Sequence, residues 1–599
     1  MNLSSLREKY AAGGTPSETI ASIFDSIRSG PPNPVWIALA PRETALARAR
    51  ALETQPGAQA LPLYGVPFAV KDNIDVEGMP TTAGCPAYAY APSTSASVVR
   101  NLLAAGAILI GKTNMDQFAT GLVGTRSPYG ACSSVFGENY ISGGSSSGSA
   151  VAVARGWVAF SLGTDTAGSG RVPAAFNNLI GLKPTRGLLS TSGVVPACRT
   201  LDCLSIFANN SSDAQLVFDA AAGFDPQDPY SREPGPGAGA APWLGAAFRF
   251  GVPAAHQLEF FGDAEAASLY AQAVEKLQDI GGQKVEIDFS IFRSAADLLY
   301  AGPWLAERTA AIGDFPEAHG DEMDPVVRQI IAGGARYSAV EAFKAQYRLE
   351  ELRRATQAEW RRIDVLLLPT TGTTYTYAAV RADPIQLNTN LGFYTNFVNL
   401  LDLAAVAVPA GFRPNGLPFG VSLIGPAFTD RALLSLAATF HRSYLGTPSV
   451  ASEQAAARGA NLAGCVQVAV VGAHLSGQPL NGQLLERGAR LQRATRTSPQ
   501  YRLYALEGTS PPKPGLIRDD HYRGPGIEVE VWNMPEDRFG GFVAGVPRPL
   551  SIGDVELTDA TLVKCFLCEP AGLAGAREIT SYGGWRAFLT DDRGRGSNA

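Results

Sequence analysis

The sequence has few histidines and few cysteines, and these shortages exclude several kinds of metal and disulfide protein. Its 599 residues include 5 histidines and 7 cysteines. An odd and small number of cysteines argues against a disulfide framework. Cys565 and Cys568 form the only CxxC pair, and one pair cannot supply the four ligands of a structural zinc site. We therefore expect no metal, and we interpret both cysteines as ordinary side chains of a strand.

The sequence also lacks an excess of positive charge and long apolar runs. The formal net charge is -6, and Lys and Arg are scattered, which argues against binding to nucleic acid or to a membrane surface. No apolar run approaches the ~18 residues of a membrane span, and Met1–Glu8 lacks the apolar core of a signal peptide. A hydrophobic fraction of 46% supports a folded chain, and we expect a cytoplasmic protein.

The pattern of apolar residues predicts an α/β domain in the first part of the chain. Segments with helical spacing alternate with short apolar runs, which indicates a mixed sheet flanked by helices. The predicted helices are 97–105, 262–280 and 339–362, and the predicted strands are 107–110, 284–287 and 364–369. A Pro- and Gly-rich segment, 234–239, is expected to be a surface loop of this domain.

Further along, the pattern changes to short strands separated by turns. An Ala-, Ser- and Gly-rich stretch, 446–464, predicts a linker between a first domain at 1–445 and a second at 465–599. The second domain is expected to be small, β-rich and barrel-like. Its predicted strands are 466–471, 501–506, 527–532, 554–557, 562–567 and 585–589.

Two motif matches in the first domain lack the context that their chemistry requires. Gly106–Thr113 fits a phosphate-binding loop, but a predicted helix precedes it and its middle residues form a strand, so we interpret the match as chance. Gly144–Gly148 fits the GxSxG nucleophile motif around Ser146, which needs a histidine base. The candidate bases lie outside Gly-rich loops and are interpreted as ordinary histidines: His256, His319 and His441.

Two Ser- and Gly-rich loops and one lysine form a combination that needs no histidine. The loops, 142–149 and 163–171, are embedded between apolar α/β segments, which is not typical of linkers. Lys71 stands at the end of an apolar strand. A lysine that is buried by such flanks favours the neutral amine, and a neutral amine is a base.

In these three segments the chain resembles the amidase signature family, over about residues 20 to 440. The interval between Ser145 and Ser169 also matches that family. The resemblance implies a Ser-Ser-Lys triad, in which Ser169 is the nucleophile and Ser145, at a cis peptide bond, relays its proton to Lys71. It also implies a structural ion pair between Asp165 and Arg171. The implied oxyanion hole consists of the backbone N–H groups of Thr166, Ala167, Gly168 and Ser169.

Other segments resemble the allophanate hydrolases in particular. They are 112–130, 300–308, 471–481 and 581–586. The resemblance of 300–308 implies that Tyr300 and Arg308 bind a substrate carboxylate, and Arg suits this role because it can hold a carboxylate with two hydrogen bonds. Tyr300 and Arg308 are about two helical turns apart, so both are expected to face one pocket. Gly124 would supply a close backbone contact to the substrate.

The resemblance implies a two-step reaction in urea degradation. The first domain would release ammonia from allophanate, and the second would help to decarboxylate the remaining N-carboxycarbamate. His474, at a strand end in a His-poor chain, is the candidate residue for the second step. No motif requires a metal or an organic cofactor. The expected partners are the small-molecule substrate, a second copy of the chain in a homodimer, and a urea carboxylase as pathway neighbour.

Two alternatives stay open. The chain is either an amidase for another small amide with a structural second domain, or part of a complex similar to the transamidosome amidase, which needs a partner and glutamine. Ammonia release from a panel of small amides separates these alternatives from allophanate hydrolysis.

Overall fold

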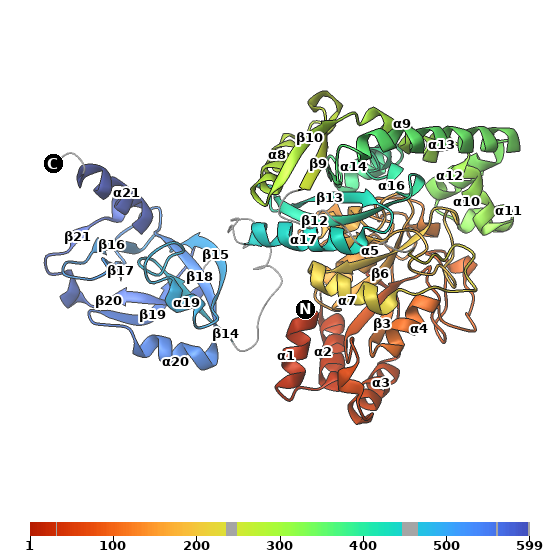
Figure 1. The fold of residues 1–599 in the computed structure, drawn as a ribbon. Coiled ribbons are helices and arrows are strands. Elements are labelled where there is room, and N and C mark those ends of the chain that lie inside the picture. The colour runs from red at the N-terminus through yellow and green to blue at the C-terminus, as the bar shows by residue number, and fades with distance from the viewer. Residues whose placement is uncertain (31–32, 235–247, 446–464, 559–560, 597–599) are drawn as a thin grey trace. The chain divides into compact units, whose positions relative to one another are not determined.

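The computed structural model describes residues 1–30, 33–234, 248–445, 465–558 and 561–596 (Figure 1). The chain divides into two compact units, Met1–Pro448 and Ser449–Ala599. The expected linker, 446–464, and residues 235–239 of the expected loop lie outside the described residues.

The larger unit is built on one mixed sheet of eleven strands (Figure 1). The strand order is β1-β3-β2-β6-β8-β7-β12-β13-β11-β9-β10. The strands are β1 (Trp36–Leu39), β2 (Pro67–Lys71), β3 (Ile108–Thr113), β6 (Phe160–Asp165), β7 (Ile180–Lys183), β8 (Cys203–Ala208), β9 (Phe248–Pro253), β10 (Gly282–Ile287), β11 (Val365–Pro369), β12 (Leu403–Phe412) and β13 (Pro418–Pro426). A separate ribbon pairs β4 (Ser133–Ser134) with β5 (Gly137–Ile141). The predicted α/β fold with a mixed sheet is confirmed.

Helices surround this sheet (Figure 1). They are α1 (Leu3–Ala11), α2 (Pro16–Ser29), α3 (Arg42–Thr54), α4 (Ser97–Ala104), α5 (Ser147–Ala154), α6 (Val172–Phe176), α7 (Ser211–Ala221), α8 (Ala264–Asp279), α9 (Ser290–Ala301), α10 (Trp304–Ile312), α11 (Phe315–His319), α12 (Pro325–Ala332), α13 (Ala339–Trp360), α14 (Tyr377–Ala382), α15 (Gln386–Leu391), α16 (Phe397–Leu400) and α17 (Asp430–Leu445). The helices predicted over 97–105, 262–280 and 339–362 correspond to α4, α8 and α13.

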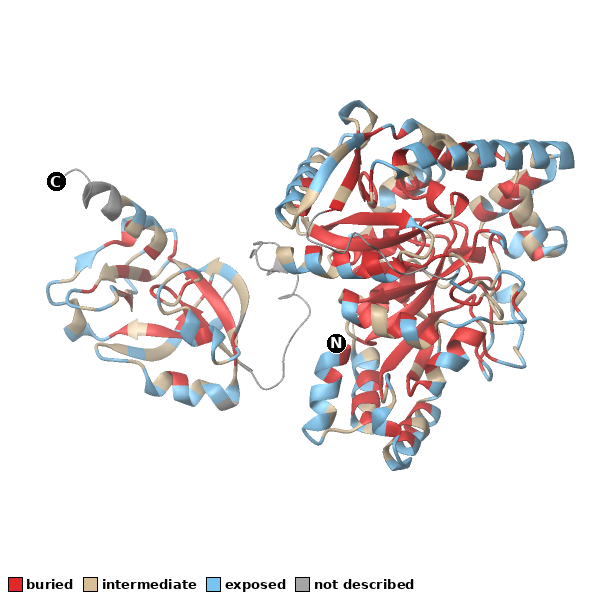
Figure 2. Ribbon diagram, in the orientation of Figure 1, coloured by how far each residue is buried: buried red, intermediate tan, exposed pale blue. Residues whose placement is uncertain are grey.

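Alternate residues of the central strands face two separate cores. Phe68 and Val70 of β2 pack in one core with residues of α4, α7, α8 and α17. Ala69, between them, packs in another core with residues of α2, α3 and α5. Because helices cover both faces, the central strands are buried on both sides and are mostly apolar. Accordingly β2, β6, β7, β8 and β11 are buried at every residue (Figure 2).

The match to a phosphate-binding loop falls on a strand, as expected. β3 runs to Thr113 and contains Lys112, whose side chain is buried. Lys112 Nζ donates to the carbonyl of Pro80 (3.0 Å) and to Thr81 Oγ1 (2.7 Å), and it lies 3.4 Å from an oxygen of Asp72. The amine of Lys112 is therefore bound by groups inside the fold and has a structural role.

The smaller unit contains a five-stranded and a three-stranded sheet, in the orders β15-β18-β14-β20-β19 and β17-β16-β21. The strands are β14 (Cys465–Val470), β15 (Arg490–Arg496), β16 (Tyr501–Ala505), β17 (Pro514–Arg518), β18 (Glu528–Pro535), β19 (Leu550–Glu556), β20 (Leu562–Cys568) and β21 (Arg577–Glu578). The helices are α19 (Gly482–Leu485), α20 (Glu536–Ala544) and α21 (Trp585–Gly596). The β-rich second domain is confirmed, and within its described residues the sheets do not close into a barrel.

One predicted strand of the smaller unit is wrong, because 585–589 begins helix α21. Trp585 and Phe588 are buried and Leu589 packs beside them. Apolar residues at spacings of three and four lie on one face of a helix, but in so short a segment this pattern cannot be distinguished from that of an apolar strand. Cys565 and Cys568 lie in β20, as expected, and the six cysteines with described side chains are free.

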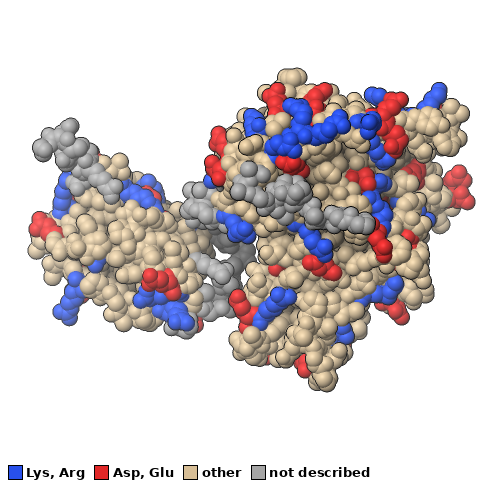
Figure 3. All heavy atoms as spheres, viewed as in Figure 1, with Lys and Arg blue, Asp and Glu red and all other residues tan. Residues whose placement is uncertain are grey.

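The described residues show three further features. No described helix is long and apolar enough to cross a membrane. In the view of Figure 3, Lys and Arg side chains lie interspersed with Asp and Glu. Among the described residues, no group of three or more His, Cys, Asp or Glu side chains is arranged to hold a metal ion.

Candidate active site

Lys71 ends β2 in the interior of the larger unit, beside the carboxyl end of the parallel strand β6. Its side chain is completely buried. Nζ donates to Ser145 Oγ (2.7 Å) and to Thr164 Oγ1 of β6 (2.6 Å). Two hydroxyl groups therefore fix the amine within the protein.

Ser145 lies in the tight turn between β5 and α5. The peptide bond between Gly144 and Ser145 is cis. A Cβ on Gly144 would lie 2.1 Å from Asp116 Oδ2, so only glycine fits there. The backbone N–H of Asp116 donates to the Ser145 carbonyl (3.0 Å), and its carboxylate accepts from the backbone N–H groups of Gly124 and Arg126 (3.0 and 2.9 Å). Asp116 thus holds the turn that carries Ser145.

Ser169 lies in the loop between β6 and α6 and completes a chain of hydrogen bonds. The Ser145 and Ser169 hydroxyl oxygens are 2.9 Å apart, and Ser169 Oγ lies 3.5 Å from the Gly121 carbonyl. Ser169 is 3% exposed. Three separate elements therefore bring Lys71, Ser145 and Ser169 into one buried proton path.

The loop that carries Ser169 also presents free backbone donors. The N–H groups of Thr166, Ala167, Gly168 and Ser169 hydrogen-bond to no other atom of the described residues. Gly168 has a φ of 145°, and a Cβ there would lie 2.5 Å from Thr395 Oγ1, so this position requires glycine. Unpaired N–H groups next to a hydroxyl nucleophile can stabilise the oxyanion of an acyl-transfer intermediate.

Asp165 and Arg171 bracket this loop as a buried ion pair. Arg171 Nε and Nη2 each lie 2.9 Å from the Asp165 carboxylate. Burial alone would raise the pKa of the Asp165 carboxyl, but the charge and hydrogen bonds of Arg171 hold it below its ordinary value. Arg171 also donates to the Thr395 carbonyl (3.2 Å), so the pair ties the loop to the rest of the fold.

Burial makes Lys71 a base near neutral pH. Desolvation lowers the pKa of Lys71 to about 7, against the opposing negative charges of Asp116, Asp202 and Asp165. The positive charge of Arg308 adds to the lowering. A large fraction of the amine is therefore neutral near pH 7 and can accept a proton from a serine hydroxyl.

Arg308 is a buried guanidinium beside this chain of hydrogen bonds. Its Nη1 donates to Thr120 Oγ1 (3.0 Å), and the next residue, Gly121, contacts Ser169. Its buried Nε has no hydrogen-bond partner, and no carboxylate of the described residues forms an ion pair with it. Glu307, the obvious candidate, instead accepts from the N–H and hydroxyl of Thr200 (2.7 and 2.8 Å).

Tyr300 and Arg308 come together by a different route from the one expected. Gly302 and Pro303 separate α9 from α10, so the two residues do not lie on one continuous helix. Nevertheless, Arg308 Cζ lies 5.5 Å from the centre of the Tyr300 ring. The bend between the helices therefore places both side chains at the same location.

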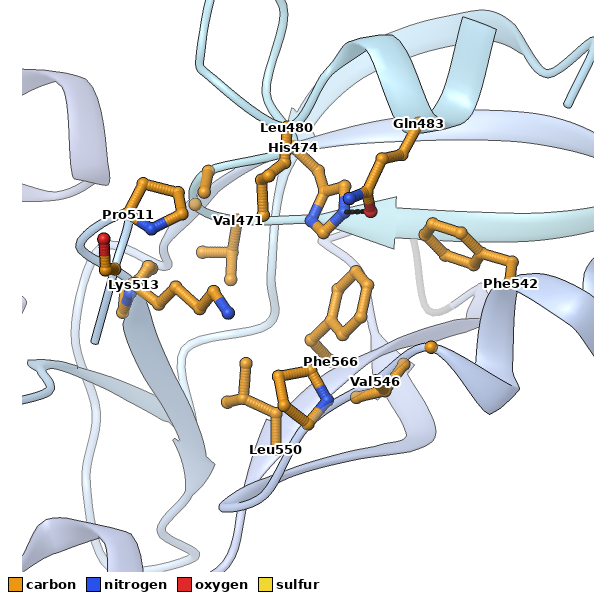
Figure 4. Close-up of a pocket in the computed structure, with 16 residues that line it drawn as sticks. Val471, His474, Leu480, Gln483, Pro511, Lys513, Phe542, Val546, Leu550 and Phe566 are labelled. Carbon is orange, nitrogen blue, oxygen red and sulfur yellow. Dashed lines mark hydrogen bonds between the residues drawn. The ribbon is translucent and has the colours of Figure 1, made fainter. Parts of the chain in front are cut away.

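His474 lines a cavity of about 230 Å³ in the smaller unit (Figure 4). Its ring stacks on Phe566 with 5.0 Å between centres and meets the edge of Phe542 at 5.5 Å. Nε2 lies 3.1 Å from Gln483 Oε1. Burial lowers the pKa of His474 below its ordinary value. The imidazole is thus fixed on three sides and is mainly neutral at pH 7 when the cavity is empty.

Two family models together match most of the sequence. The model described as Amidase matches residues 33–434. The chain belongs to the amidase family. A second model, Allophanate hydrolase C-terminal domain, matches residues 466–590, which lie in the smaller unit.

Individual relatives match along both units. A urea amidolyase of Lachancea kluyveri is 46% identical over 589 residues, which cover 95% of this chain and 32% of that protein. The chain therefore spans about a third of that relative. The structure of an allophanate hydrolase of Kluyveromyces lactis is 43% identical, covers 98% of each chain and has a TM-score of 0.70. The structure of a peptide amidase of Stenotrophomonas maltophilia is 26% identical, covers 74% of this chain and 96% of its own, and has a TM-score of 0.62.

The amidase fold brings most of the sequence-predicted residues of the larger unit together, and it adds others that the sequence did not single out. Gly124 lies at the Ser145 turn with a φ of 73°, and its N–H is bound to Asp116, which leaves its carbonyl for other contacts. The additional residues are Thr164, Asp116, Thr120 and Asp202. The carboxylate of Asp202 accepts a hydrogen bond from Thr166 Oγ1 (2.5 Å). The GxSxG interpretation gains no support, because Ser146 Oγ donates to the Thr164 carbonyl (3.1 Å) and hydrogen-bonds to no histidine of the described residues.

Proposed function

We propose that this chain hydrolyses allophanate to ammonia and carbon dioxide, with acyl transfer in the larger unit and decarboxylation in the smaller one. The observation that carries the proposal is the position of Arg308. Its buried guanidinium forms no ion pair with a carboxylate of the described residues, and it lies next to the hydrogen bonds that link Lys71 to Ser169. Allophanate is a urea that carries one carboxylate. A buried cation needs a counter-charge, and the substrate would supply it.

In the structure Lys71 donates a hydrogen bond to Ser145, and Ser145 donates one to Ser169. In the first step protons move in the opposite direction, from Ser169 towards Lys71. The neutral amine of Lys71 takes the proton of Ser145, which takes the proton of Ser169. Ser169 Oγ then attacks the terminal carbonyl carbon of allophanate, and the N–H groups of residues 166–169 stabilise the oxyanion. Collapse of this intermediate breaks the carbon–nitrogen bond, and the leaving nitrogen takes the proton and departs as ammonia. Water hydrolyses the Ser169 ester and releases N-carboxycarbamate.

In the second step N-carboxycarbamate loses one carboxylate as carbon dioxide. The carbon–nitrogen bond breaks, its electron pair stays on nitrogen, and the nitrogen takes a proton. His474 is the proposed source of that proton, because an imidazole can donate and accept near neutral pH. The carbamate product decays to ammonia and carbon dioxide without help.

We propose in addition that residues 1–445 and 465–599 form the two domains and that the chain is a cytoplasmic homodimer. A biotin-dependent urea carboxylase would supply allophanate. Light scattering on the purified chain measures the oligomeric state, and a monomer at micromolar concentration would contradict the homodimer.

The sharpest test compares allophanate with biuret, in which a neutral amide replaces the carboxylate. We expect ammonia release from allophanate to exceed that from biuret, and Arg308→Met to reduce the difference. A chain that prefers biuret or malonamide would instead be an amidase of other specificity. Activity that requires glutamine and a second protein would favour the transamidosome-type alternative.

A further inference from the structure

The cavity of the smaller unit is lined by a second ionisable side chain besides His474. Lys513 points into the space that His474, Phe566, Val471 and Leu550 border (Figure 4). Lys513 is half-buried, and its amine makes no hydrogen bond or ion pair with any described residue. The described cavity wall contains no Asp or Glu. A lysine amine is thus directed, without a counter-charge, into a cavity that is bordered mainly by apolar side chains.

The backbone holds Lys513 in this position. Its N–H donates to Thr509 Oγ1 (3.0 Å), and its carbonyl accepts from the N–H of Leu506 (3.1 Å). Pro514, which follows it, packs directly on Gly472, where a Cβ would lie 2.2 Å from the proline Cδ. Gly472 stands two positions before His474, so the close contact of glycine and proline sets the segment of Lys513 against the segment of His474.

The charges that act on His474 are of one sign. Lys513 and Arg487 both act on it, and no acidic group of the described residues is among the causes of its pKa shift. Arg487 is half-buried, its Nη1 donates to the Gln483 carbonyl (2.9 Å), and its guanidinium lies 5.8 Å from the centre of the Phe542 ring. Two cations and a histidine without an acidic partner are suited to an anionic ligand.

We propose that this cavity binds a small dicarboxylate and that Lys513 binds one of its two carboxylates. This inference rests on the proposed function and specifies its second step, in which the dicarboxylate is N-carboxycarbamate. Lys513 holds the carboxylate that is retained. The carboxylate that is lost lies against the apolar wall, where departure of neutral carbon dioxide removes a charge from a poorly solvated place.

The orientation of His474 agrees with this arrangement. An amide oxygen accepts hydrogen bonds, so Gln483 Oε1 receives the Nε2–H of the imidazole and leaves Nδ1 for the cavity. A bound dianion raises the proton affinity of Nδ1, which then takes a proton from solvent and passes it to the nitrogen of the ligand as the carbon–nitrogen bond breaks. The products are carbamate, carbon dioxide and a neutral imidazole.

The test uses the intact chain and malonate, in which a methylene replaces the N–H of N-carboxycarbamate. The probe has the same two carboxylates and does not decompose. Malonate is titrated into chain labelled with carbon-13 histidine, and the His474 resonances are identified by their loss in His474→Gln. We expect malonate to shift these resonances and to raise the His474 pKa.

Three lysine variants make the test specific. Lys513→Met removes the charge at similar side-chain length and is expected to weaken malonate binding at this site by about ten- to a hundredfold. Lys513→Arg keeps the charge and should retain most of the affinity, which distinguishes loss of charge from loss of structure. Lys564→Met is the matched control, because Lys564 is the only other lysine after residue 449 and pairs with Asp554 at 2.8 Å. It should bind malonate as tightly as the unsubstituted chain.

Unchanged malonate affinity in Lys513→Met would overturn the role of Lys513. The lifetime of N-carboxycarbamate, followed by NMR of labelled allophanate, separates this failure from failure of the proposed function. If His474→Ala prolongs that lifetime and Lys513→Met changes neither lifetime nor malonate affinity, the decarboxylation stands and the lysine assignment falls. If malonate binds through Lys513 and neither variant changes the lifetime, the cavity binds dicarboxylates and the proposed decarboxylation falls.

Discussion

In the larger unit Lys71 and Ser145 are completely buried and hydrogen-bonded to each other, whereas in the smaller unit the amine of Lys513 points into a cavity without a partner among the described residues. The two sites also differ in the side chains that hold them in place. A buried carboxylate, Asp116, and the ion pair of Asp165 and Arg171 hold the serine loops. The cavity around His474 is bordered mainly by apolar and aromatic side chains and proline. Figure 2 shows the same contrast, with long buried strands in the larger unit and mixed burial in the smaller one.

This difference follows from the chemistry proposed for each site. A serine hydroxyl is a weak nucleophile and attacks an amide only if a base takes its proton and fixed donors receive the oxyanion. Such a site must be pre-organised and shielded from water, which explains its many internal partners. Decarboxylation of N-carboxycarbamate needs only an anchored carboxylate and a proton.

The largest effect is expected from Ser169→Ala, which removes the proposed nucleophile. Residues that act as a unit fail together, and loss of a catalytic serine typically lowers kcat by about 10⁶-fold. Ammonia release and mass spectrometry for an acyl-enzyme measure the effect. Ser146→Ala is the matched control, since Ser146 lies in the neighbouring turn and its hydroxyl bonds to the backbone of Thr164. Near-normal turnover in Ser169→Ala, or an adduct on Ser146, would refute the proposed triad.

The next effect concerns the base. Lys71→Ala and Ser145→Ala should each lower the rate by about 10²- to 10⁴-fold, the usual contribution of general acid–base catalysis. Only neutral Lys71 accepts a proton, and its pKa is lowered to about 7, so kcat/KM should fall about tenfold per pH unit below that value. A pH–rate profile that stays flat from pH 8 to about pH 5 would exclude a lysine base.

Arg308 is expected to affect specificity more than chemistry. A charge-assisted hydrogen bond to a carboxylate contributes about 1.5–3 kcal/mol, so Arg308→Met should raise KM for allophanate by about ten- to a hundredfold and affect biuret much less. Tyr300→Phe should give a smaller effect of the same kind. Arg308 also lowers the pKa of Lys71. Its removal should therefore move the acid limb of the pH profile to higher pH, and equal losses for both substrates with no such move would assign Arg308 a structural role.

The sequence predicted the residues of the larger site that stand in distinctive patterns. Lys71 at the end of an apolar run and the two Ser- and Gly-rich loops carry the resemblance to the amidase signature family, and that resemblance implied the triad of Lys71, Ser145 and Ser169. The roles of Thr164 and Asp116 could not be predicted, because each is an ordinary polar residue that acts on a residue of another segment. Asp116 contacts Ser145 in the turn before α5, and Thr164 lies 93 positions from Lys71. No local pattern encodes such a contact, which depends on the register of parallel strands.

The errors have equally local causes. The helical spacing of Tyr300 and Arg308 does not account for the break between α9 and α10, which Gly302 and Pro303 produce. The strand predicted at 585–589 was too short for its period to be distinguished from that of a helix. Nothing in the sequence distinguishes Lys513, since a lysine between prolines in a turn is a typical surface residue. Only the cavity reveals where its amine points.

The smallest effect on the first ammonia is expected from changes in the smaller unit. The residues proposed for acyl transfer, Lys71, Ser145 and Ser169, all belong to the larger unit, so a chain that ends within 446–464 should still release ammonia from allophanate. The smaller unit has a core of its own, built by residues such as Val468, Val531 and Trp585, which supports independent folding of the two units.

The same truncated chain should accumulate N-carboxycarbamate, and His474→Ala in the intact chain should reproduce this accumulation. The reason is that both lack the imidazole proposed to deliver the proton in the second step. Labelled allophanate followed by carbon NMR in the intact, truncated and His474→Ala chains measures the lifetime of the intermediate directly. His441→Ala, which alters a histidine of the larger unit, is the matched control and should leave that lifetime unchanged. If the intact, truncated and His474→Ala chains show the same lifetime, the smaller unit is not a catalyst, and its role would be dimerisation or stability.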